Sequence, residues 1–474
     1  MNLNQIFSQN RFKNFSLINF TLSKFINLLF ISIAMLVLSS CDKDQTYDKS
    51  KAVFAYIADD NLQIDNKLAN QPIKLPPQIL NTEFSGSLAH ANQKIENFYK
   101  KWDYNQGKDF LKTQKEIKLT KSWSKSILYW SEKNENFHYQ PVINKQKLFV
   151  LDGSAQLFAF DLLTKKLIYK KQIFDKSWLK NYRSVNLSID QDTLYATMGT
   201  NHLVAVNAID GKVIWQKQVS AVLNSKPITS DGYIYVSTDN NKTYCFNQQN
   251  GDIIWIHSGV VRSTAIFGSP EPLIYQDKVI IGYSSGEVYA LNKKTAESIW
   301  VQDLNLNKAI TSDFYLNDVD ASLLVKNDIV YAIGNGGLLK AINVKNGQAI
   351  WKKQIAGIAN FWLAGDYLFV INNDNKLIAI NRNSAGIKWI KNLPDYQNPK
   401  KTLTKYIYNG LVMAGDKLVI SRQDGVVMLV NVDDAKIEKT MDLGKKIVHT
   451  PLINNDKIYL QAVGRMAMEI IELM

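Results

Sequence analysis

Hydrophobic and polar residues alternate in short runs along most of the chain. One run is Gly232-Tyr-Ile-Tyr-Val-Ser237; polar residues at 239–241 follow it, and then comes a second run at 243–246. Successive side chains of a strand point to opposite faces, so this alternation predicts half-buried β-strands joined by tight turns. A third run, 252–255, ends in Trp255. Together the three runs predict an antiparallel meander that is too small to bury its own faces.

The turn before the third run recurs along the chain. In its full form a small residue is followed by Asn two positions later, by Gly after four more and by Trp after another four, as in Ala205-Val-Asn207-Ala-Ile-Asp-Gly211-Lys-Val-Ile-Trp215. Asn bonds nearby backbone amides and Gly accepts a positive φ, so the frame predicts a hairpin. The residues at the Trp position of the seven copies, some of them degraded, are Tyr169, Trp215, Trp255, Trp300, Trp351, Trp389 and Lys439.

The spacing of these copies predicts the architecture. They lie 38 to 51 residues apart, about the length of one four-stranded propeller blade. In such a ring each aromatic residue docks between two neighbouring sheets. Trp123 lies 46 residues before Tyr169, and the unit that follows Pro451 has no Trp strand of its own. We therefore expect an all-β, eight-bladed propeller of four-stranded antiparallel blades, closed by pairing of N- and C-terminal segments, which leaves no free sheet edge at the closure.

The first 40 residues are typical of a signal peptide. An apolar run at 25–38 follows three basic residues, and it is short for a membrane span. It ends in Leu38-Ser-Ser-Cys41, which resembles a bacterial lipobox. This resemblance implies that Cys41 is lipidated, becomes the mature N-terminus and anchors the protein to a membrane. The alternatives are an ordinary secretory signal with an incidental cysteine, or a plain transmembrane anchor.

The remaining chain divides by composition. Residues 41–75 are rich in Asn, Asp, Lys and Gln, which predicts a lipidated and largely disordered tether. Residues 76–116 are interpreted as a lead-in segment packed on the propeller, and residues 117–474 as the propeller itself. The contents of 46% hydrophobic and 11% aromatic residues suit a folded domain.

The net charge of +13 does not by itself indicate nucleic acid. Its lysines are spread mostly singly through predicted loops, which favours a compositional bias of the source genome over a binding patch. An exported lipoprotein also has no access to nucleic acid, so we expect no nucleic-acid partner.

Candidate chemistry is sparse. The five histidines fall in separate units with no ligand spacing, and neither a Gly-x-Ser-x-Gly elbow nor a phosphate loop is present. Cys245 occupies the small-residue position of a repeat, which favours a buried packing role. We therefore expect no catalytic residue, metal or cofactor. The close carboxylate pair Asp318 and Asp320 is open to two interpretations: acid–base or cation chemistry, or a solvated polar loop.

Two families share this repeat: the quinoprotein alcohol dehydrogenases and the BamB family, the lipoproteins of the β-barrel assembly machinery. The chain resembles the BamB family over nearly all of its mature length. The resemblance is carried by the lipobox, by Leu75-Pro-Pro through Phe84, by 260–270 and 282–291, and most specifically by Asn317-Asp-Val-Asp-Ala-Ser-Leu-Leu324 with 336–351.

This resemblance implies a non-enzymatic scaffold that assists the folding and insertion of outer-membrane β-barrel proteins. Its partners would be the periplasmic POTRA domains of BamA and other subunits of the machinery. Asp318 and Asp320 match one partner-binding loop of the family, and Val261-Arg262 matches another, with Val261 replacing a leucine. The implied location is the periplasmic face of the outer membrane, although Asp42, directly after Cys41, also fits retention in the inner membrane.

Two other functions remain open. A dehydrogenase that uses pyrroloquinoline quinone and calcium would need calcium ligands, a catalytic Asp and, in many members, adjacent cysteines, whereas Cys245 has no neighbouring cysteine. A lipoprotein propeller that serves another envelope complex would share every feature of the repeat.

Overall fold

The computed structural model describes residues 62–85, 96–105, 116–128, 140–179, 184–260, 269–305, 318–398, 401–463 and 467–474. The chain divides into two units, 1–56 and 57–474, and every described residue belongs to the second. The predicted signal peptide and Cys41 therefore lie outside the described residues. Neither α2 (Asn66–Ala69) nor any other helix in these ranges has the length and apolar surface to cross a bilayer.

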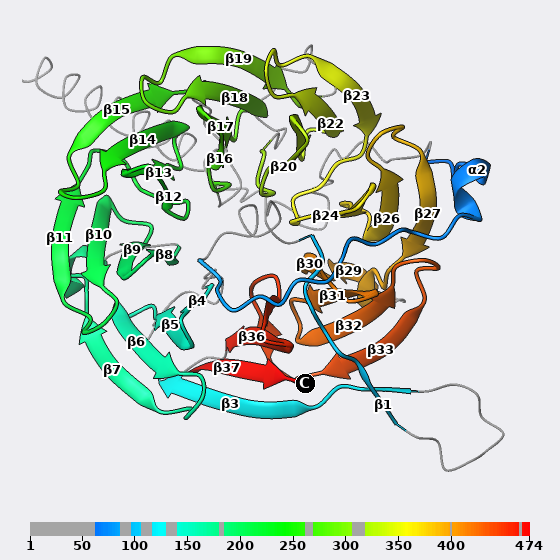
Figure 1. Ribbon diagram of the computed structural model, residues 1–474, viewed down its shortest axis with the longest axis horizontal. Helices are drawn as coiled ribbons and strands as arrows, with labels where there is room; N and C mark the ends of the chain where they lie inside the picture. Colours follow the sequence, from blue (N-terminus) through cyan, green and yellow to red (C-terminus); the bar gives the residue numbers. More distant parts are fainter. Residues whose placement is uncertain are drawn as a thin grey trace, which may run out of the picture. The chain divides into compact units, whose positions relative to one another are not determined.

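Eight antiparallel sheets are arranged around a central axis (Figure 1), which confirms the predicted propeller. Within a blade the chain runs from an inner strand through a second and a third strand to an outer strand. Blade 1 contains β4 (Val142–Asn144), β5 (Lys147–Leu151), β6 (Gln156–Asp161) and β7 (Leu167–Gln172). Blade 2 contains β8 (Asn186–Asp190), β9 (Thr193–Thr197), β10 (His202–Asn207) and β11 (Val213–Gln218). Blade 3 contains β12 (Ile228–Ser230), β13 (Tyr233–Ser237), β14 (Lys242–Asn247) and β15 (Ile253–Ser258).

The next four blades repeat this order. Blade 4 contains β16 (Leu273–Tyr275), β17 (Lys278–Gly282), β18 (Glu287–Asn292) and β19 (Ser298–Asp303). Blade 5 contains β20 (Leu324–Lys326), β21 (Ile329–Ile333), β22 (Leu338–Asn343) and β23 (Ala349–Gln354). Blade 6 contains β24 (Trp362–Ala364), β25 (Tyr367–Ile371), β26 (Lys376–Asn381) and β27 (Ile387–Asn392). Blade 7 contains β30 (Tyr408–Ala414), β31 (Lys417–Arg422), β32 (Val426–Asn431) and β33 (Ile437–Asp442).

Blade 8 is assembled from both ends of the described chain. Its C-terminal strands are β34 (Lys446–Ile447), β35 (Leu452–Asn454), β36 (Lys457–Val463) and β37 (Ala467–Leu473), and its outer strand is β3 (Lys121–Leu128). β3 pairs with β37 along its length, with Trp123 opposite Glu472. The structure therefore confirms the predicted closure of the ring by N- and C-terminal segments.

The repeated turn explains how the blades pack. In each of the seven copies the small residue lies directly across the sheet from the residue at the Trp position, next to a shift in strand register; Ala205, for example, pairs with Trp215. A small side chain leaves room for the indole to lean toward the next blade. Cys245 is fully buried opposite Trp255, and burial raises the pKa of its thiol to about 12, which keeps it protonated and unreactive.

Each repeat aromatic residue also donates a hydrogen bond to a backbone carbonyl of the next blade. The donor–acceptor pairs are Tyr169–Ala208 (3.1 Å), Trp215–Gln248 (3.3 Å), Trp255–Lys293 (3.1 Å), Trp300–Val344 (2.8 Å), Trp351–Arg382 (2.8 Å) and Trp389–Val432 (2.8 Å). The indole or phenol ring packs on the turn of that blade, where Gly251, at φ +73°, has no space for a Cβ beside Trp215.

The seventh copy lacks an aromatic residue for a structural reason. Lys439 lies on β33, the outer strand of blade 7, and blade 8 is the next blade along the chain. In blade 8 the third strand, β37, and the outer strand, β3, come from distant parts of the chain, so no hairpin turn joins them. Blade 8 therefore offers no hairpin turn against which an aromatic residue at this position could dock. Trp123, the outer-strand residue of blade 8, packs at the turn of blade 1, with the Lys165 ammonium 4.9 Å from its ring.

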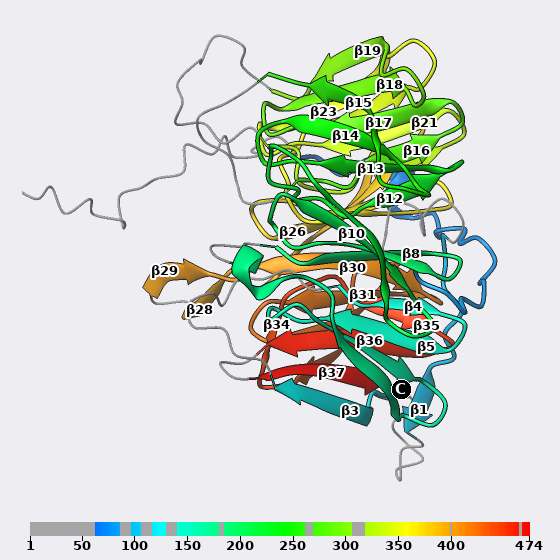
Figure 2. The ribbon, with the colours of Figure 1, turned by 90° about the vertical axis from the view of Figure 1, so that its left-hand side faces the viewer.

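The two faces of the ring differ in their connections. The turns between inner and second strands, and between third and outer strands, lie on one face, which we call the turn face. The loops that join an outer strand to the next inner strand lie on the other, which we call the loop face. The helix η1 (Lys176–Leu179) and the hairpin of β28 (Tyr396–Asn398) and β29 (Lys401–Lys405) belong to such loops and project from this side (Figure 2).

An extended strap, residues 62–85 and 96–102, crosses the turn face (Figure 1). It contains α2, and it leads into the short pair β1 (Asp103–Asn105) and β2 (Glu116–Lys118). Two contacts tie its first part to blades 6 and 7: Asp65 N to Ile387 O at 2.8 Å, and Ile73 N to the Asp433 carboxylate at 2.7 Å. Residues 62–75, the last part of the predicted tether, thus lie on the ring.

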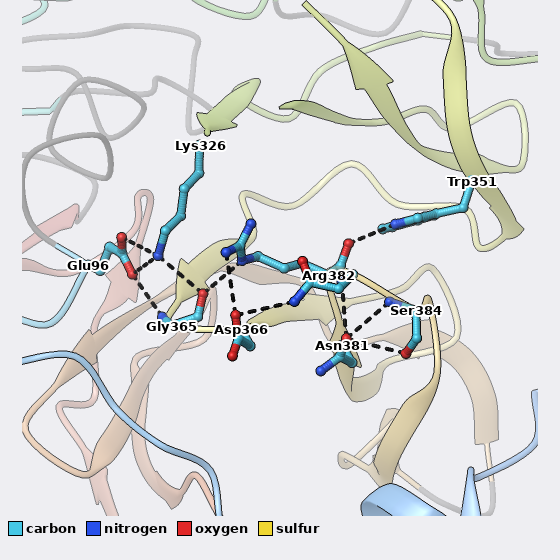
Figure 3. Close-up of polar contacts among 9 residues, drawn as sticks. Glu96, Lys326, Trp351, Gly365, Asp366, Asn381, Arg382 and Ser384 are labelled. Carbon is cyan, nitrogen blue, oxygen red and sulfur yellow. Dashed lines mark hydrogen bonds and ion pairs between the residues drawn. The ribbon is translucent and has the colours of Figure 1, made fainter. Parts of the chain in front are cut away.

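Glu96 fixes the second part of the strap. Its carboxylate accepts hydrogen bonds from Lys326 Nζ at 2.6 Å and from Gly365 N at 2.8 Å, so it joins the turns of blades 5 and 6 (Figure 3). The same view shows Trp351 of blade 5 donating to the carbonyl of Arg382, whose side chain in turn donates to Gly365 O at 3.0 Å. The strap and the docking turn therefore share one polar network.

Candidate partner-binding site on the loop face

The candidate partner-binding residues predicted from the sequence belong to two connecting segments, one on each side of blade 4 in the chain. Val261 and Arg262 belong to the loop between blades 3 and 4 and fall outside the described residues, which stop at Val260 and resume at 269. Asp318 and Asp320 belong to the loop between blades 4 and 5, at the point where the described residues resume after 305. Blade 4 separates the two loops.

The base of the first loop is held by the turn between the second and third strands of blade 3. Asn241 sits there with φ +58°, a left-handed conformation that Asn tolerates. Its side-chain amide donates to Val260 O at 2.6 Å, and its backbone carbonyl accepts from Gly259 N at 2.8 Å. Its side-chain oxygen accepts from Ser284 N at 2.9 Å. Asn241 therefore joins the start of the Arg262 loop to blade 4.

Tyr283 packs directly on this loop base. A Cβ built on Gly259 would lie 2.4 Å from Tyr283 Cδ2, so the loop passes over the ring at a point where only glycine fits. The Tyr283 hydroxyl lies 2.9 Å from His257 Nδ1 and 3.0 Å from Thr243 Oγ1. Burial raises the pKa of Tyr283 and lowers that of His257, so both groups are neutral partners in this network.

The second loop reaches the same tyrosine from the other side. Val319 N donates to Tyr283 O at 3.3 Å, and a Cβ on Gly282 would lie 2.6 Å from Val319 Cγ1. Asp318 O accepts from Asn335 N of blade 5 at 2.9 Å. The structure thus brings the described ends of both predicted loops together on Tyr283, one on its ring and one on its backbone.

The two carboxylates of the second loop differ in exposure. Asp318 is fully buried, as is Val319, so the Asp318 side chain shapes the loop from within. Asp320 is partly buried, and burial, followed by the nearby Asp318 charge, raises its pKa to about 7. Within the described residues no group of three metal-ligating side chains occurs, so the pair has no third ligand there.

Two positioning residues, Tyr283 and Asn241, were not identified from the sequence. Tyr283 stands at the end of a strand among many other tyrosines, and its contacts are to residues 24 and 36 positions away, which an alternating pattern does not reveal. Asn241 stands in a polar run that predicts only a turn. The glycine at 259 was the available signal, because a glycine without a turn frame indicates a close approach of backbone to a neighbour.

Comparison with known proteins agrees with this architecture. A family model described as outer membrane protein assembly factor BamB matches residues 175–391. The outer membrane protein assembly factor BamB of Yersinia pestis is 25% identical over 362 residues, which cover 74% of this chain and 88% of that protein.

Solved structures show the same fold. The crystal structure of BamB from Moraxella catarrhalis superposes with a TM-score of 0.60 at 16% identity, over 75% of this chain and 99% of that one. A europium-containing methanol dehydrogenase superposes with a TM-score of 0.58 at 11% identity, over 75% of this chain and 93% of that one, a likeness of fold alone. The chain is thus an eight-bladed propeller that is similar to BamB proteins in its sequence and in its PQQ-type repeats.

Proposed function

We propose that this BamB-type assembly-factor propeller acts as a non-enzymatic scaffold of the β-barrel assembly machinery. In this role it binds the periplasmic POTRA domains of BamA, together with other subunits, and assists the folding and insertion of outer-membrane β-barrel proteins. Lipidation at Cys41 would hold it at the periplasmic face of the outer membrane. The observation that carries the proposal is the convergence of the two loops of the loop face on Tyr283.

The geometry suits recognition of a folded partner. Both loop bases are fixed to a rigid sheet, and loops on a rigid scaffold are the usual carriers of binding function. Arg262 supplies a cation in the first loop, and Asp320 supplies a partly buried carboxylate in the second. Because Asp318 is buried, direct contact in the second loop falls to Asp320 and its neighbours, whereas Asp318 maintains the loop shape.

Affinity capture of the tagged, lipidated protein from detergent-solubilised envelope tests this proposal. We expect BamA to copurify with the parent chain. Arg262→Glu combined with Asp320→Ala should reduce BamA recovery at least about tenfold, as expected when charged interface groups are removed or reversed. Asp434→Ala, an exposed site on the turn face, is the matched control and should leave recovery unchanged.

The capture also separates the alternatives. Equal recovery of BamA by the parent and the double variant would show that these loops are not the interface. Recovery of a different set of envelope proteins, without BamA, would favour a scaffold of another complex and contradict the proposal.

A further inference from the structure

A groove of about 870 Å³ opens on the turn face, on the side of the ring opposite to the two loops discussed above. One wall is the strap at Leu80–Ser85. The other is formed by the inner strands and turns of blades 1, 2 and 3, at residues 143–145, 188–192 and 227–231. The groove therefore lies beside the central axis, where inner strand edges face inward.

The strap shows how extended chain binds here. Phe84 exchanges two backbone hydrogen bonds with Ile143 of blade 1, Phe84 N to Ile143 O at 2.7 Å and Ile143 N to Phe84 O at 2.8 Å. Ser85 O accepts from Ile189 N of blade 2 at 3.1 Å. The inner strands of the first two blades thus accept backbone pairing from an added segment, which is the geometry of strand addition.

Blade 3 offers the next inner edge of the groove. Its inner strand, β12, pairs with β13 on one side, and in the described part of the chain no backbone hydrogen bond joins the strap to its other side. Pro227 and residues 228–231 nevertheless line the groove. An extended segment lying in the groove would run along this edge, as the strap runs along the inner edge of blade 1.

The groove is acidic although the chain as a whole carries a net charge of +13. Among the described lining residues, four carry carboxylates and Lys145 carries a positive charge; the carboxylates belong to Glu83, Asp190, Asp192 and Asp231. Asp192 pairs with Lys145 at 3.0 Å, and Asp231 pairs with Lys293. Among the described residues, Glu83 and Asp190 have no ion-pair partner, and Asp190 accepts a hydrogen bond from Gln248 at 2.8 Å. Two carboxylates therefore remain to meet a cation.

A buried polar group in the groove wall also lacks a partner. Ser188 lines the groove and is 5% exposed, and its hydroxyl makes no hydrogen bond to any described residue. Buried hydroxyls are nearly always paired, so an unpaired one indicates a position that a bound group can satisfy.

From these observations we propose that the groove binds an extended polypeptide segment that carries lysine or arginine side chains. Its backbone pairs with the inner edge of β12, its cations meet Glu83 and Asp190, and a polar group reaches the Ser188 hydroxyl. This site lies on the turn face and does not depend on the loop-face function, so either can fail while the other stands.

Fluorescence anisotropy with the purified full chain tests the proposal. The probe is a fluorescein-labelled decapeptide of alternating Lys and Thr, and a decapeptide of alternating Glu and Thr is its charge-reversed counterpart. We expect saturable binding of the basic peptide alone, weakened about tenfold between 50 and 200 mM salt because the contact is ionic. N-methylation of alternate peptide nitrogens, which removes backbone donors, should weaken binding at least about fivefold if strand pairing contributes.

Variants locate the site. Glu83→Gln changes an exposed side chain and should lower affinity about threefold, and Glu83→Gln with Asp190→Asn about tenfold, as two partly screened ion contacts are lost. The control, Asp210→Asn with Asp434→Asn, makes the same change of charge at exposed turns outside the groove and should bind as the parent does. Binding of both peptides alike, or an equal loss in the groove and control variants, would overturn the proposal.

Discussion

Asp320→Asn is expected to stabilise the protein, and to do so more strongly as pH rises. In the folded state burial and the Asp318 charge raise the pKa of Asp320 from 3.8 to about 7. The folded state therefore binds a proton that the unfolded state releases above pH 4. Stability contributed by this group is largest below pH 4, falls as pH rises toward 7, and is constant above it. Asparagine does not titrate, so the variant does not lose folding stability as pH rises.

The size of the effect follows from the two pKa values. At 1.36 kcal/mol per pKa unit, the carboxylate of the parent costs about 2 kcal/mol at pH 5 and about 4 kcal/mol at pH 8. The difference in unfolding free energy between variant and parent should thus widen by about 2–3 kcal/mol over this range. Urea unfolding followed by tryptophan fluorescence at pH 5 and pH 8 measures it directly.

A second aspartate provides the control. Hydrogen bonds from Thr164 lower the pKa of Asp161, a partly exposed residue of the blade 1 turn, so this group is ionised in both states between pH 5 and pH 8. Asp161→Asn should therefore shift the two unfolding curves equally. Parallel pH profiles for the parent and Asp320→Asn would refute the assignment of a partly buried, proton-binding carboxylate to Asp320.

Three further outcomes are expected. Glu472→Gln should lower the free energy of unfolding at pH 7 by about 3 kcal/mol in urea unfolding. Glu472 is buried in blade 8 and accepts hydrogen bonds from two lysines, a tyrosine and a serine. These hydrogen bonds outweigh the effect of burial and bring the pKa of Glu472 to about 2. Gly251→Ala should lower the free energy of unfolding by about 2 kcal/mol or more, because its Cβ would lie 2.7 Å from the Trp215 ring. Gly232→Ala, at φ +81° with nothing within 4 Å, should lower it by only about 1 kcal/mol through backbone strain. Equal losses of stability by calorimetry would argue against docking of Trp215 at the turn. Tyr283→Ala should reduce BamA recovery in the capture assay while Tyr283→Phe, which keeps the ring on Gly259, retains it; equal recovery with both variants would separate the tyrosine from the loops.

The blades could be predicted from the sequence because the information that specifies them is local. Each turn contains a residue that caps it, a position that takes a positive φ and an aromatic residue that reaches the next blade, all within eleven positions. The same logic predicted that Trp123 completes the last blade. It did not explain why Lys439 breaks the pattern, since the reason lies in the missing hairpin of a different blade.

The candidate site could be predicted less completely. Asp318 and Asp320 are two residues apart in the sequence. Which of them is buried depends on contacts with blade 5 and with Tyr283, and these contacts do not affect the hydrophobic periodicity of the sequence. The sequence predicts that residues 76–116 pack on the propeller, but it does not indicate which blades they contact. The pairing of the strap with blades 1 and 2 uses backbone groups of residues such as Phe84 and Ile143, and backbone pairing between segments distant in sequence is not encoded in composition.

The assembly of blade 8 has a consequence for the order of folding. β3 emerges early in synthesis, but its partner β37 is separated from it by more than 330 residues. Seven blades can therefore collapse while β3 still exposes an unpaired edge, and long-range closure of this kind slows folding. A chain that ends before β37 would keep two open strand edges, on β3 and β36, and such edges promote aggregation. Closure of the ring therefore requires β37, and a chain truncated before this strand cannot close the ring.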